Sequence, residues 1–442
     1  MGDLLTETFT TLKRSTILHQ SLRIVKHYFL FFTQIILKRI FFAHNCRNCA
    51  LFRSFTHPLF MTNAANNLLI NALSERKDTG LLRSLTTLDG LIDFCSNDYL
   101  GLAKNKALAE QISAVIAIWQ GQQAEQVPVN GSTGSRLISG NSLLVEEFEK
   151  QCANMHQAEA ALLFSSGFEA NLGLISALAQ KEHVIFCDKL LHASLIDGLR
   201  LSAAERRIFK HNDLSDLVHL LEQYPTETIK WVVVESVYSM DGDIAPLNEL
   251  VKLKEKYNFE LIVDEAHAGG IYGPQGAGLC VEMGLQDSIF ARVVTFGKAW
   301  GNAGSVILGS AILRTYLINF ARPFIYSTAP APMHVLGLQR TLTYIIEAVE
   351  ERQKLKNRIL YFKSLLKSPS WGESNTAIQT YFVSGNEAVR KLAAKVQAAG
   401  FGVKPIVYPT VPKGKERIRI TLNANSSHDH IERIIQLLES NA

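Results

Sequence analysis

Between residues 160 and 310 the chain alternates short apolar runs with stretches of helical length, and this alternation limits the fold more than any other feature. Apolar runs of strand length are typical of buried parallel strands, which need crossover helices between them. The predicted strands are residues 161–164, 184–187, 230–235, 260–264, 292–296 and 305–308. The predicted helices include residues 142–155, 214–222 and 246–257. The sequence therefore predicts an α/β fold with a mostly parallel sheet.

The pattern changes near residue 335, where a long charged helix is predicted over residues 336–366. Short strands and helices follow as far as residue 440, which indicates a smaller α+β domain. The predicted organisation is an extension (1–61), an N-terminal segment (62–105), a large domain (106–335) and a small C-terminal domain (336–442).

The first 61 residues differ from the rest of the chain, because they hold eight Lys or Arg and only two acidic residues. Their longest apolar run, residues 28–37, is too short for a membrane span, which needs about 20 apolar residues. An interfacial anchor or an organellar transit peptide would fit this composition. We favour a third interpretation, in which translation starts at Met61 and the upstream stretch is not native or is dispensable.

The charge and cysteine content narrow the function classes. The net charge is +4, and the basic excess lies in the terminal extension, so no nucleic-acid partner is expected. Six scattered cysteines in a chain of 442 residues do not make a disulfide framework, which favours a reducing, cytoplasmic location. A membrane partner is not expected either.

Lys298 is the first candidate for chemistry. It lies in the stretch VVTFGKAWG, in an apolar, Gly-flanked turn between two predicted strands. An ammonium group there would be poorly hydrated, and this lowers a lysine pKa and favours Schiff-base chemistry. The stretch lacks the spacing of a phosphate-binding P-loop.

Asp264 and His267 follow another predicted strand, in the stretch LIVDEAHAGG. A carboxylate at that place could be a metal ligand, a salt-bridge partner or the group that keeps a pyridine nitrogen protonated. No further acidic or histidine cluster completes a metal site, so none is expected. His267 could contact the phenolic oxygen of the same ring.

Two further motifs are weak when taken singly. SSGFEAN (165–171) lies between a strand and a helix, where backbone N–H groups can hold a phosphate. HASL (192–195) offers His192, which could stack on an aromatic cofactor or could simply begin a helix.

Taken together, the motifs resemble the α-oxoamine synthases, which are fold-type I pyridoxal-5'-phosphate enzymes. They are, in chain order, CSNDYLGL (95–102), GSTGSRLISGN (131–141), SSGFEAN (165–171), DKLLHASL (188–195), ESVYSMDGDIAPL (235–247), VDEAH (263–267), TFGKAWG (295–301), FIYSTAP (324–330) and PTVPKGKERIRITL (409–422). The resemblance covers residues 62–442 almost without a gap. It implies a large domain with a mostly parallel seven-stranded sheet and a smaller α+β C-terminal domain.

The resemblance also implies a role for each candidate residue. Lys298 would be the Schiff-base lysine, Asp264 would pair with the ring nitrogen, and His192 would stack on the ring. Further cofactor contacts would come from the main chain of Gly167 and Phe168, from Thr295, and from Ser239 and His267 at the ring substituents. The substrate site would use Arg419 for the amino-acid carboxylate, with Arg83, Asn97 and Thr410 around the acyl group. Thr328 would reach the phosphate of a neighbouring subunit, which implies a homodimer with shared active sites.

The implied reaction is the condensation of an amino acid with an acyl thioester, with loss of carbon dioxide. The motifs ESVYSMDGD, FIYSTAP and PTVP are most similar to the biotin-pathway branch of the family, which implies L-alanine and a pimeloyl thioester. Glycine C-acetyltransferases, 5-aminolevulinate synthases and serine palmitoyltransferases share most motifs, and the N-terminal extension mildly favours the last two. A non-catalytic partner subunit has little support, since both histidines, Asp264 and Lys298 are present.

Overall fold

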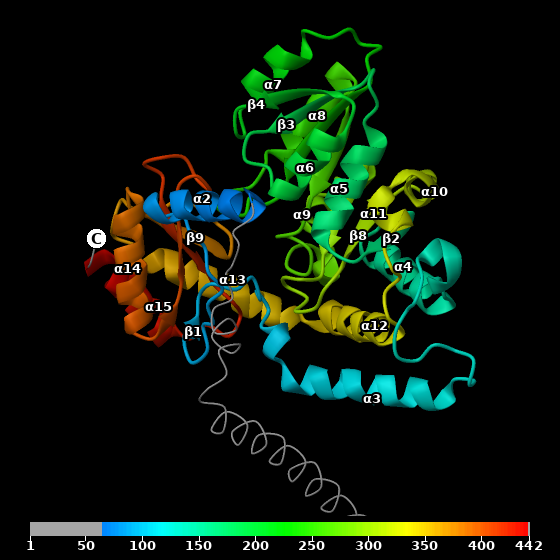
Figure 1. Cartoon of the computed structure of the whole chain (residues 1–442), viewed down its shortest axis with the longest axis horizontal. Helices are drawn as coiled ribbons and strands as arrows, with labels where there is room; N and C mark the ends of the chain where they lie inside the picture. Colours follow the sequence, from blue (N-terminus) through cyan, green and yellow to red (C-terminus); the bar gives the residue numbers. More distant parts are fainter. Residues whose placement is uncertain (1–63, 441–442) are drawn as a thin grey trace, which may run out of the picture. The chain divides into compact units, whose positions relative to one another are not determined.

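A seven-stranded sheet forms the centre of the structure, a computed structural model that describes residues 64–440. The strands run in the order β2-β8-β7-β6-β5-β3-β4 (Figure 1). Only β8 is antiparallel to its neighbours, β2 and β7, so the predicted mostly parallel sheet is confirmed. The strands are β2 (Ala160–Phe164), β3 (Val184–Asp188), β4 (Glu205–Phe209), β5 (Lys230–Glu235), β6 (Glu260–Asp264), β7 (Ala291–Thr295) and β8 (Ser305–Gly309).

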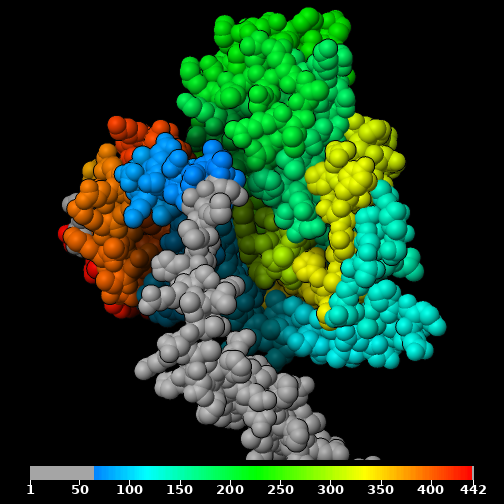
Figure 2. Space-filling view, in the orientation of Figure 1, coloured from blue at the N-terminus to red at the C-terminus, as the bar shows by residue number. Residues whose placement is uncertain are grey.

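Strand β4 is absent from the predicted strands. Its sequence, ERRIF, begins with three charged residues, and only Phe209 is buried. It is one of the two edge strands of the sheet, where charged side chains can reach solvent and disfavour pairing with other chains. With α7 (Leu214–Leu221) it lies in the green part of Figures 1 and 2.

The side chains of the sheet alternate between two hydrophobic cores. In β5, Val232 and Val234 belong to one core and Val233 belongs to the other, as the two-residue period of a strand requires. Helices therefore cover both faces. Besides α7, the helices of this part of the chain are α3 (Lys106–Gln122), α4 (Leu143–Met155), α5 (Gly167–Leu178), α6 (Ala193–Leu201), α8 (Leu247–Tyr257), α9 (Leu279–Glu282), α10 (Ala311–Phe320) and α11 (Arg322–Ile325).

The long helix predicted over residues 336–366 is two helices, α12 (Pro332–Glu347) and α13 (Val349–Leu365). The break is at the buried Ala348, whose ψ of 46° is not helical. The carbonyl of Ile345 accepts hydrogen bonds from the Ala348 N–H at 3.3 Å and from the Arg352 guanidinium at 2.6 Å, which satisfy this end of α12. Because Ala is a strong helix former, the sequence carries no local signal for this break.

The C-terminal region forms a second, three-stranded antiparallel sheet in the order β11-β12-β9. Its elements are β9 (Ile378–Phe382), α14 (Asn386–Ala398), β11 (Lys404–Ile406), β12 (Arg417–Thr421) and α15 (His428–Ser440). Two short strands far apart in sequence, β1 (Ile92–Asp93) and β10 (Phe401–Gly402), pair in parallel. The predicted smaller α+β part after the large sheet is therefore present.

The chain divides into two units, residues 1–84 and 85–442. In the first unit the structure describes α2 (Ala64–Asp78), at the start of the N-terminal segment predicted over residues 62–105. The extension 1–61, with its alternative interpretations, lies outside the described residues, and the other predicted domain boundaries stay predictions. Among residues 64–440, no helix is both long and apolar enough to cross a membrane.

Candidate active site

Polar side chains meet where the central strands β5, β6 and β7 end. Asp264 is the last residue of β6, and the strand register places it directly beside Glu235, the last residue of β5. Lys298 lies in the turn between β7 and β8. The carboxyl edge of a parallel sheet is where α/β proteins bind ligands, so the prediction for Asp264 and Lys298 falls at a suitable place.

Burial dominates the electrostatics of this group. It lowers the pKa of the Lys298 amine to about 8, although the negative charges of Asp264 and Glu235 act in the opposite direction. Burial also raises the pKa of Glu235 to about 8, and the neighbouring Asp264 adds to this rise. A larger fraction of the Lys298 amine is therefore neutral near neutral pH than for an exposed lysine, which favours a nucleophilic or proton-accepting role.

A chain of hydrogen bonds joins Asp264 to His192. The amide nitrogen Nδ2 of Asn171 donates to Asp264 Oδ2 at 2.7 Å and to Ser194 Oγ at 3.0 Å. The Ser194 hydroxyl lies 2.7 Å from His192 Nδ1, and the Ser194 backbone N–H also donates to that nitrogen. His192 Nδ1 is therefore an acceptor. Burial lowers the pKa of His192, so its imidazole is neutral at neutral pH.

The backbone of His192 is also held in place. Its backbone N–H donates to the carboxyl oxygen Oε1 of Glu235 at 2.5 Å, and its residue caps the N-terminus of α6. Glu235, Asn171 and Ser194 are the supporting residues that sequence reasoning missed. All three lie inside quoted motifs, and all are polar in otherwise apolar surroundings, which is the signal that could have identified them.

The turn between β2 and α5 forms a cradle beside Thr295. Ser166 caps α5, so the N–H groups of Gly167 and Phe168 lie in the first helical turn, where backbone donors have no partner inside the helix. A Cβ atom on Gly167 would lie 3.4 Å from the side chain of Thr295, so the two segments pack tightly. The helix N-terminus and its free donors suit a phosphate group.

His267, three residues after Asp264, is buried. Its Nδ1 is 2.5 Å from the hydroxyl oxygen of Tyr99. Tyr99 lies in the motif CSNDYLGL, and the sequence predicted no role for it. Burial places the pKa of His267 well below its usual range, and the charges of Lys298 and Arg419 add to this effect. His267 is therefore a neutral hydrogen-bonding group.

Arg419 projects from β12 and links the second sheet to the site. Its guanidinium donates to the carbonyl of Ser239 at 2.6 Å, to Asn97 Oδ1 at 2.8 Å and to Thr421 Oγ1 at 3.0 Å. The structure thus brings together Arg419, Asn97 and Ser239, three of the predicted site residues, although they are distant in sequence.

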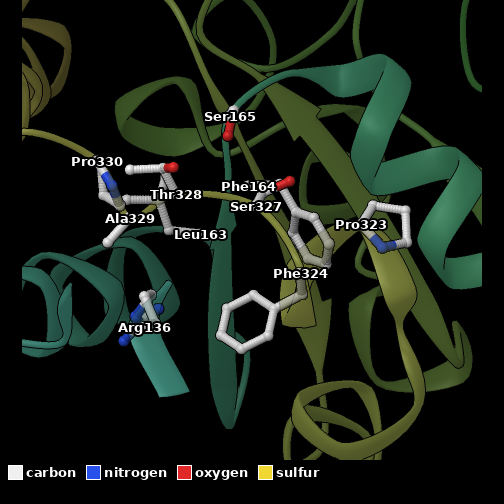
Figure 3. A pocket seen from close by; sticks show the side chains of 10 residues that line it. All are labelled: Arg136, Leu163, Phe164, Ser165, Pro323, Phe324, Ser327, Thr328, Ala329 and Pro330. Atoms are coloured by element: carbon white, nitrogen blue, oxygen red, sulfur yellow. The ribbon is translucent and has the colours of Figure 1, made fainter. Parts of the chain in front are cut away.

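Two other predicted residues, Thr410 and Thr328, lie outside this group. Thr410 is exposed, and its backbone N–H donates to the carbonyl of Val407. Arg83 belongs to the first unit, and its role stays a prediction. Thr328 is exposed and lines a pocket together with Arg136, Ser165 and Phe324 (Figure 3).

The group as a whole fits pyridoxal 5'-phosphate. It offers a lysine amine of lowered pKa, a buried carboxylate for the ring nitrogen, an imidazole on an exposed helix cap, and a helix N-terminus for the phosphate. The acceptor Oδ1 of the buried Asn171 has no hydrogen-bond partner in the structure, so this wall of the site keeps a free acceptor. In the described part of the chain, no three His, Cys, Asp or Glu side chains are grouped to hold a metal ion.

Comparison with known proteins agrees with this geometry. Residues 89–438 match the family model "Aminotransferase class I and II". A putative 8-amino-7-oxononanoate synthase of Geobacillus kaustophilus is 38% identical over 79% of this chain and 88% of its own length. An 8-amino-7-oxononanoate synthase of Emericella nidulans is 36% identical over 84% of this chain and 94% of its own length.

Solved structures give the same result. The serine palmitoyltransferase of S. paucimobilis with bound PLP–myriocin superposes with a TM-score of 0.75 and 26% identity, over 85% of this chain and 96% of that one. The 8-amino-7-oxononanoate synthase of Francisella tularensis superposes with a TM-score of 0.66 and 29% identity, over 80% of this chain and 98% of that one. The chain therefore belongs to the aminotransferase class I and II family, and within it to the α-oxoamine synthases, fold-type I enzymes whose cofactor is pyridoxal 5'-phosphate.

Proposed function

We propose that this protein condenses L-alanine with a pimeloyl thioester, pimeloyl-CoA or a pimeloyl carrier protein, to form 8-amino-7-oxononanoate in biotin biosynthesis. A carbon–carbon bond forms between the α-carbon of alanine and the thioester carbonyl. The thiol leaves with a proton, and the alanine carboxylate leaves as carbon dioxide. The observation that carries the proposal is the identity of 36–38% to relatives that bear this name, over about four fifths of the chain.

Arg419 would hold the alanine carboxylate. Its fork of N–H donors is the geometry that carboxylates prefer, and its low exposure strengthens a charge-assisted hydrogen bond. Asn97 and the carbonyl of Ser239 fix the guanidinium at two of its nitrogens, which limits the directions in which it can bind.

Lys298 would move the proton at the α-carbon. An amine with a pKa of about 8 is partly neutral near pH 7, so it can accept a proton and later return it. Pyridoxal phosphate, when bound, supplies the electron sink that stabilises the carbanion at that carbon. Asp264 would keep the ring nitrogen protonated, while Asn171 holds the carboxylate in place.

His192 would cover the ring face and polarise the thioester carbonyl. Its Nδ1 is occupied as an acceptor by Ser194, which directs the remaining ring nitrogen, Nε2, to act as the donor. Gly167, Phe168 and Thr295 would bind the phosphate, and Ser239 and His267 the ring substituents. Arg83 and Thr410 would shape the acyl site with Asn97.

The proposal includes a homodimer in which Thr328 reaches the cofactor phosphate of the other subunit. Exposed apolar side chains on two segments that line the pocket of Figure 3 support the dimer: Ile138, two residues after Arg136, is 82% exposed, and Tyr326, two residues after Phe324, is 72% exposed. Apolar side chains gathered at a surface mark interaction sites. Sedimentation analysis would test the dimer.

Product analysis is the test of the proposed reaction. The purified protein should convert L-alanine and pimeloyl-CoA to 8-amino-7-oxononanoate, identified by mass spectrometry. Its kcat/KM for that pair should exceed the values for glycine with acetyl-CoA or succinyl-CoA. The variant Arg419→Lys should raise the KM for alanine, whereas Arg433→Lys, on α15, should not. Arg83→Ala should weaken the thioester more than alanine.

Serine with a long-chain acyl thioester is the second candidate. It is favoured by the higher TM-score of the serine palmitoyltransferase structure, 0.75 against 0.66. One methyl or hydroxyl group in a small pocket is worth only about 1–3 kcal/mol of discrimination, so serine belongs in the same comparison. A clear preference for serine and palmitoyl-CoA would exclude the pimeloyl assignment and leave the family membership intact.

A further inference from the structure

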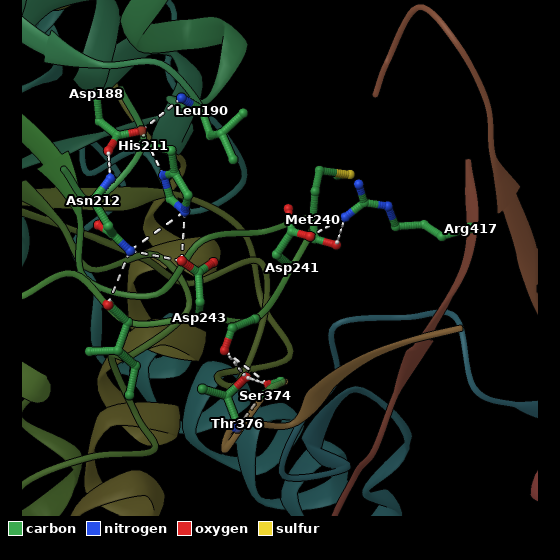
Figure 4. A network of polar contacts seen from close by, with 12 residues as sticks. Asp188, Leu190, His211, Asn212, Met240, Asp241, Asp243, Ser374, Thr376 and Arg417 are labelled. Atoms are coloured by element: carbon green, nitrogen blue, oxygen red, sulfur yellow. Dashed lines mark hydrogen bonds and ion pairs between the residues drawn. The ribbon is translucent and has the colours of Figure 1, made fainter. Parts of the chain in front are cut away.

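His211 lies between two carboxylates outside the group described above (Figure 4). It follows β4, and its ring nitrogen Nδ1 is 2.9 Å from Asp188 Oδ1, at the end of β3. Its other nitrogen, Nε2, is 2.6 Å from Asp243 Oδ2, in the loop after β5. Because a carboxylate oxygen can only accept, a histidine that serves both must carry both protons and a positive charge.

The surroundings hold this arrangement in place. The Asp188 side chain is fully buried, and those of His211 and Asp243 are 24% and 27% exposed. Asn212 adds two hydrogen bonds, from its backbone to Asp188 and from its side chain to Asp243. The ring of Tyr238 meets the imidazole edge to face, with 4.5 Å between ring centroids. These three residues, Asp188, Asp243 and Tyr238, are the titratable groups that face His211.

Burial opposes the charge on His211, but the hydrogen bonds to both carboxylates outweigh it and raise the pKa of His211 to about 10. The cation is therefore present throughout the neutral range.

The loop of residues 237–244, which carries Asp243, also connects to the second sheet. The Gly242 carbonyl accepts hydrogen bonds from the hydroxyls of Ser374 and Thr376, at 2.9 and 3.0 Å. Asp241 forms an ion pair with Arg417 on β12. The Ser239 carbonyl accepts from Nε of Arg419, two residues further along the same strand.

The loop therefore has two anchors. On one side the His211 cation ties Asp243 to the end of β3, and on the other the loop carbonyls and Asp241 receive donors from the second sheet. A backbone bridge between Val237 and Ile244 and a hydrogen bond from the Tyr238 N–H to the Asp243 carbonyl make the loop a closed unit. A shift at Asp243 would thus move the Ser239 carbonyl and the guanidinium it orients.

We propose that His211 is a positioning residue for the amino-acid carboxylate site, acting through Asp243 and the Ser239 carbonyl on Arg419. The inference rests on the proposed role of Arg419 as the carboxylate-binding group. It assigns a function to a histidine that touches neither the cofactor residues nor Arg419 itself.

The test uses the holoenzyme and separates amino-acid binding from the other steps. The variant His211→Gln removes the cation while keeping a polar side chain. The matched control is His183→Asn, because His183 precedes the same strand β3 at its opposite end and is also half-buried. The Kd for L-alanine, without thioester, is read from the change in cofactor absorbance, and the Kd for pyridoxal phosphate is measured on the cofactor-free protein.

His211→Gln should weaken L-alanine binding about tenfold, the effect of losing one charge-assisted hydrogen bond from the orienting chain. Its Kd for pyridoxal phosphate and its KM for the thioester should stay close to wild type. If His211→Gln does not fold, Asp243→Asn serves in its place, since it keeps the pair of His211 with Asp188 and weakens only the link to the loop.

An alanine Kd no larger than that of His183→Asn would overturn the inference. So would a parallel loss of alanine, cofactor and thioester affinity, which would indicate a general structural role. Arg419→Lys separates a failure of the His211 inference from a failure of the proposed function. If Arg419→Lys loses alanine binding and His211→Gln does not, only the inference on His211 fails. If the wild-type absorbance responds to no amino acid, the proposed function fails and takes the inference with it.

Discussion

The charged His211 predicts a specific dependence of stability on pH. The pKa of His211 is raised from 6.5 to about 10 in the folded protein, because hydrogen bonds to Asp188 and Asp243 outweigh the cost of burial. A group whose pKa is raised by folding stabilises the folded state fully below its unfolded pKa, and this contribution is lost as the pH rises through the folded pKa. The window for His211 therefore runs from about pH 6.5 to about pH 10.

The size of the effect follows from the same shift. One pKa unit corresponds to about 1.4 kcal/mol, so the full shift would correspond to about 5 kcal/mol. The side chain is 24% exposed, and solvent screening reduces this to about 2–3 kcal/mol. His211→Gln lacks the contribution, so its deficit in unfolding free energy should shrink by that amount between about pH 6 and pH 10.

Urea unfolding of the cofactor-free proteins measures this deficit. Wild type and His211→Gln are compared at about pH 6, 8 and 10, so that groups that titrate in both, such as Lys298, cancel. In His211→Gln, Asp188 and Asp243 face each other without a cation, and the resulting loss of unfolding free energy is the same at every pH in this window. A deficit that stays constant from pH 6 to pH 10 would show that His211 is not held as a cation and would refute the reasoning.

Three further predictions concern other parts of the chain. Borohydride reduction of the holoenzyme should attach the cofactor to Lys298 and to no other lysine, as peptide mass spectrometry can check, and Lys298→Ala should lose turnover. Gly242→Ala should destabilise the protein by about 2 kcal/mol or more in urea unfolding, because Gly242 has a φ of +73° and an added Cβ would lie 2.4 Å from the Ile378 carbonyl. A chain that begins at Met61 should keep full activity, since every candidate residue follows it; a strong loss of activity on truncation would contradict this.

The sequence was most informative about features that depend on local residue type, such as buried strands and charged residues at strand ends. Apolar runs predicted six of the seven strands of the large sheet, and the seventh, β4, was missed because an edge strand can carry charged residues. Lys298 and Asp264 stood out as charged residues that break apolar surroundings next to strand ends. Lys298 and Asp264 lie close together because the parallel sheet brings the carboxyl ends of its strands to one edge.

Local sequence patterns did not predict the residues that support the site through hydrogen bonds. Asn171 and Ser194 matter because one amide reaches both Asp264 and the cap of α6, and this depends on how α5 packs against α6. Tyr99 and His267 meet across 168 positions of sequence. The role proposed for His211 likewise depends on two carboxylates that come from other strands and loops. Such partners are set by tertiary packing, which a single sequence does not encode in its periodicity.

The split origin of the site has a consequence for synthesis on the ribosome. The residues proposed to bind the cofactor within one subunit, from Gly167 to Lys298, lie on strands of the large sheet or on the turns and helices between them, and this sheet is complete once β8 has emerged. Arg419 belongs to β12, among the last elements to be translated, and it must then join Asn97, which emerged long before. Because domains generally fold as units while the chain is being made, a nascent chain can complete the proposed cofactor pocket well before Arg419, the proposed carboxylate-binding residue, has been added to the polypeptide. On the proposed roles, the part of the site that binds the amino acid is therefore the last to be assembled.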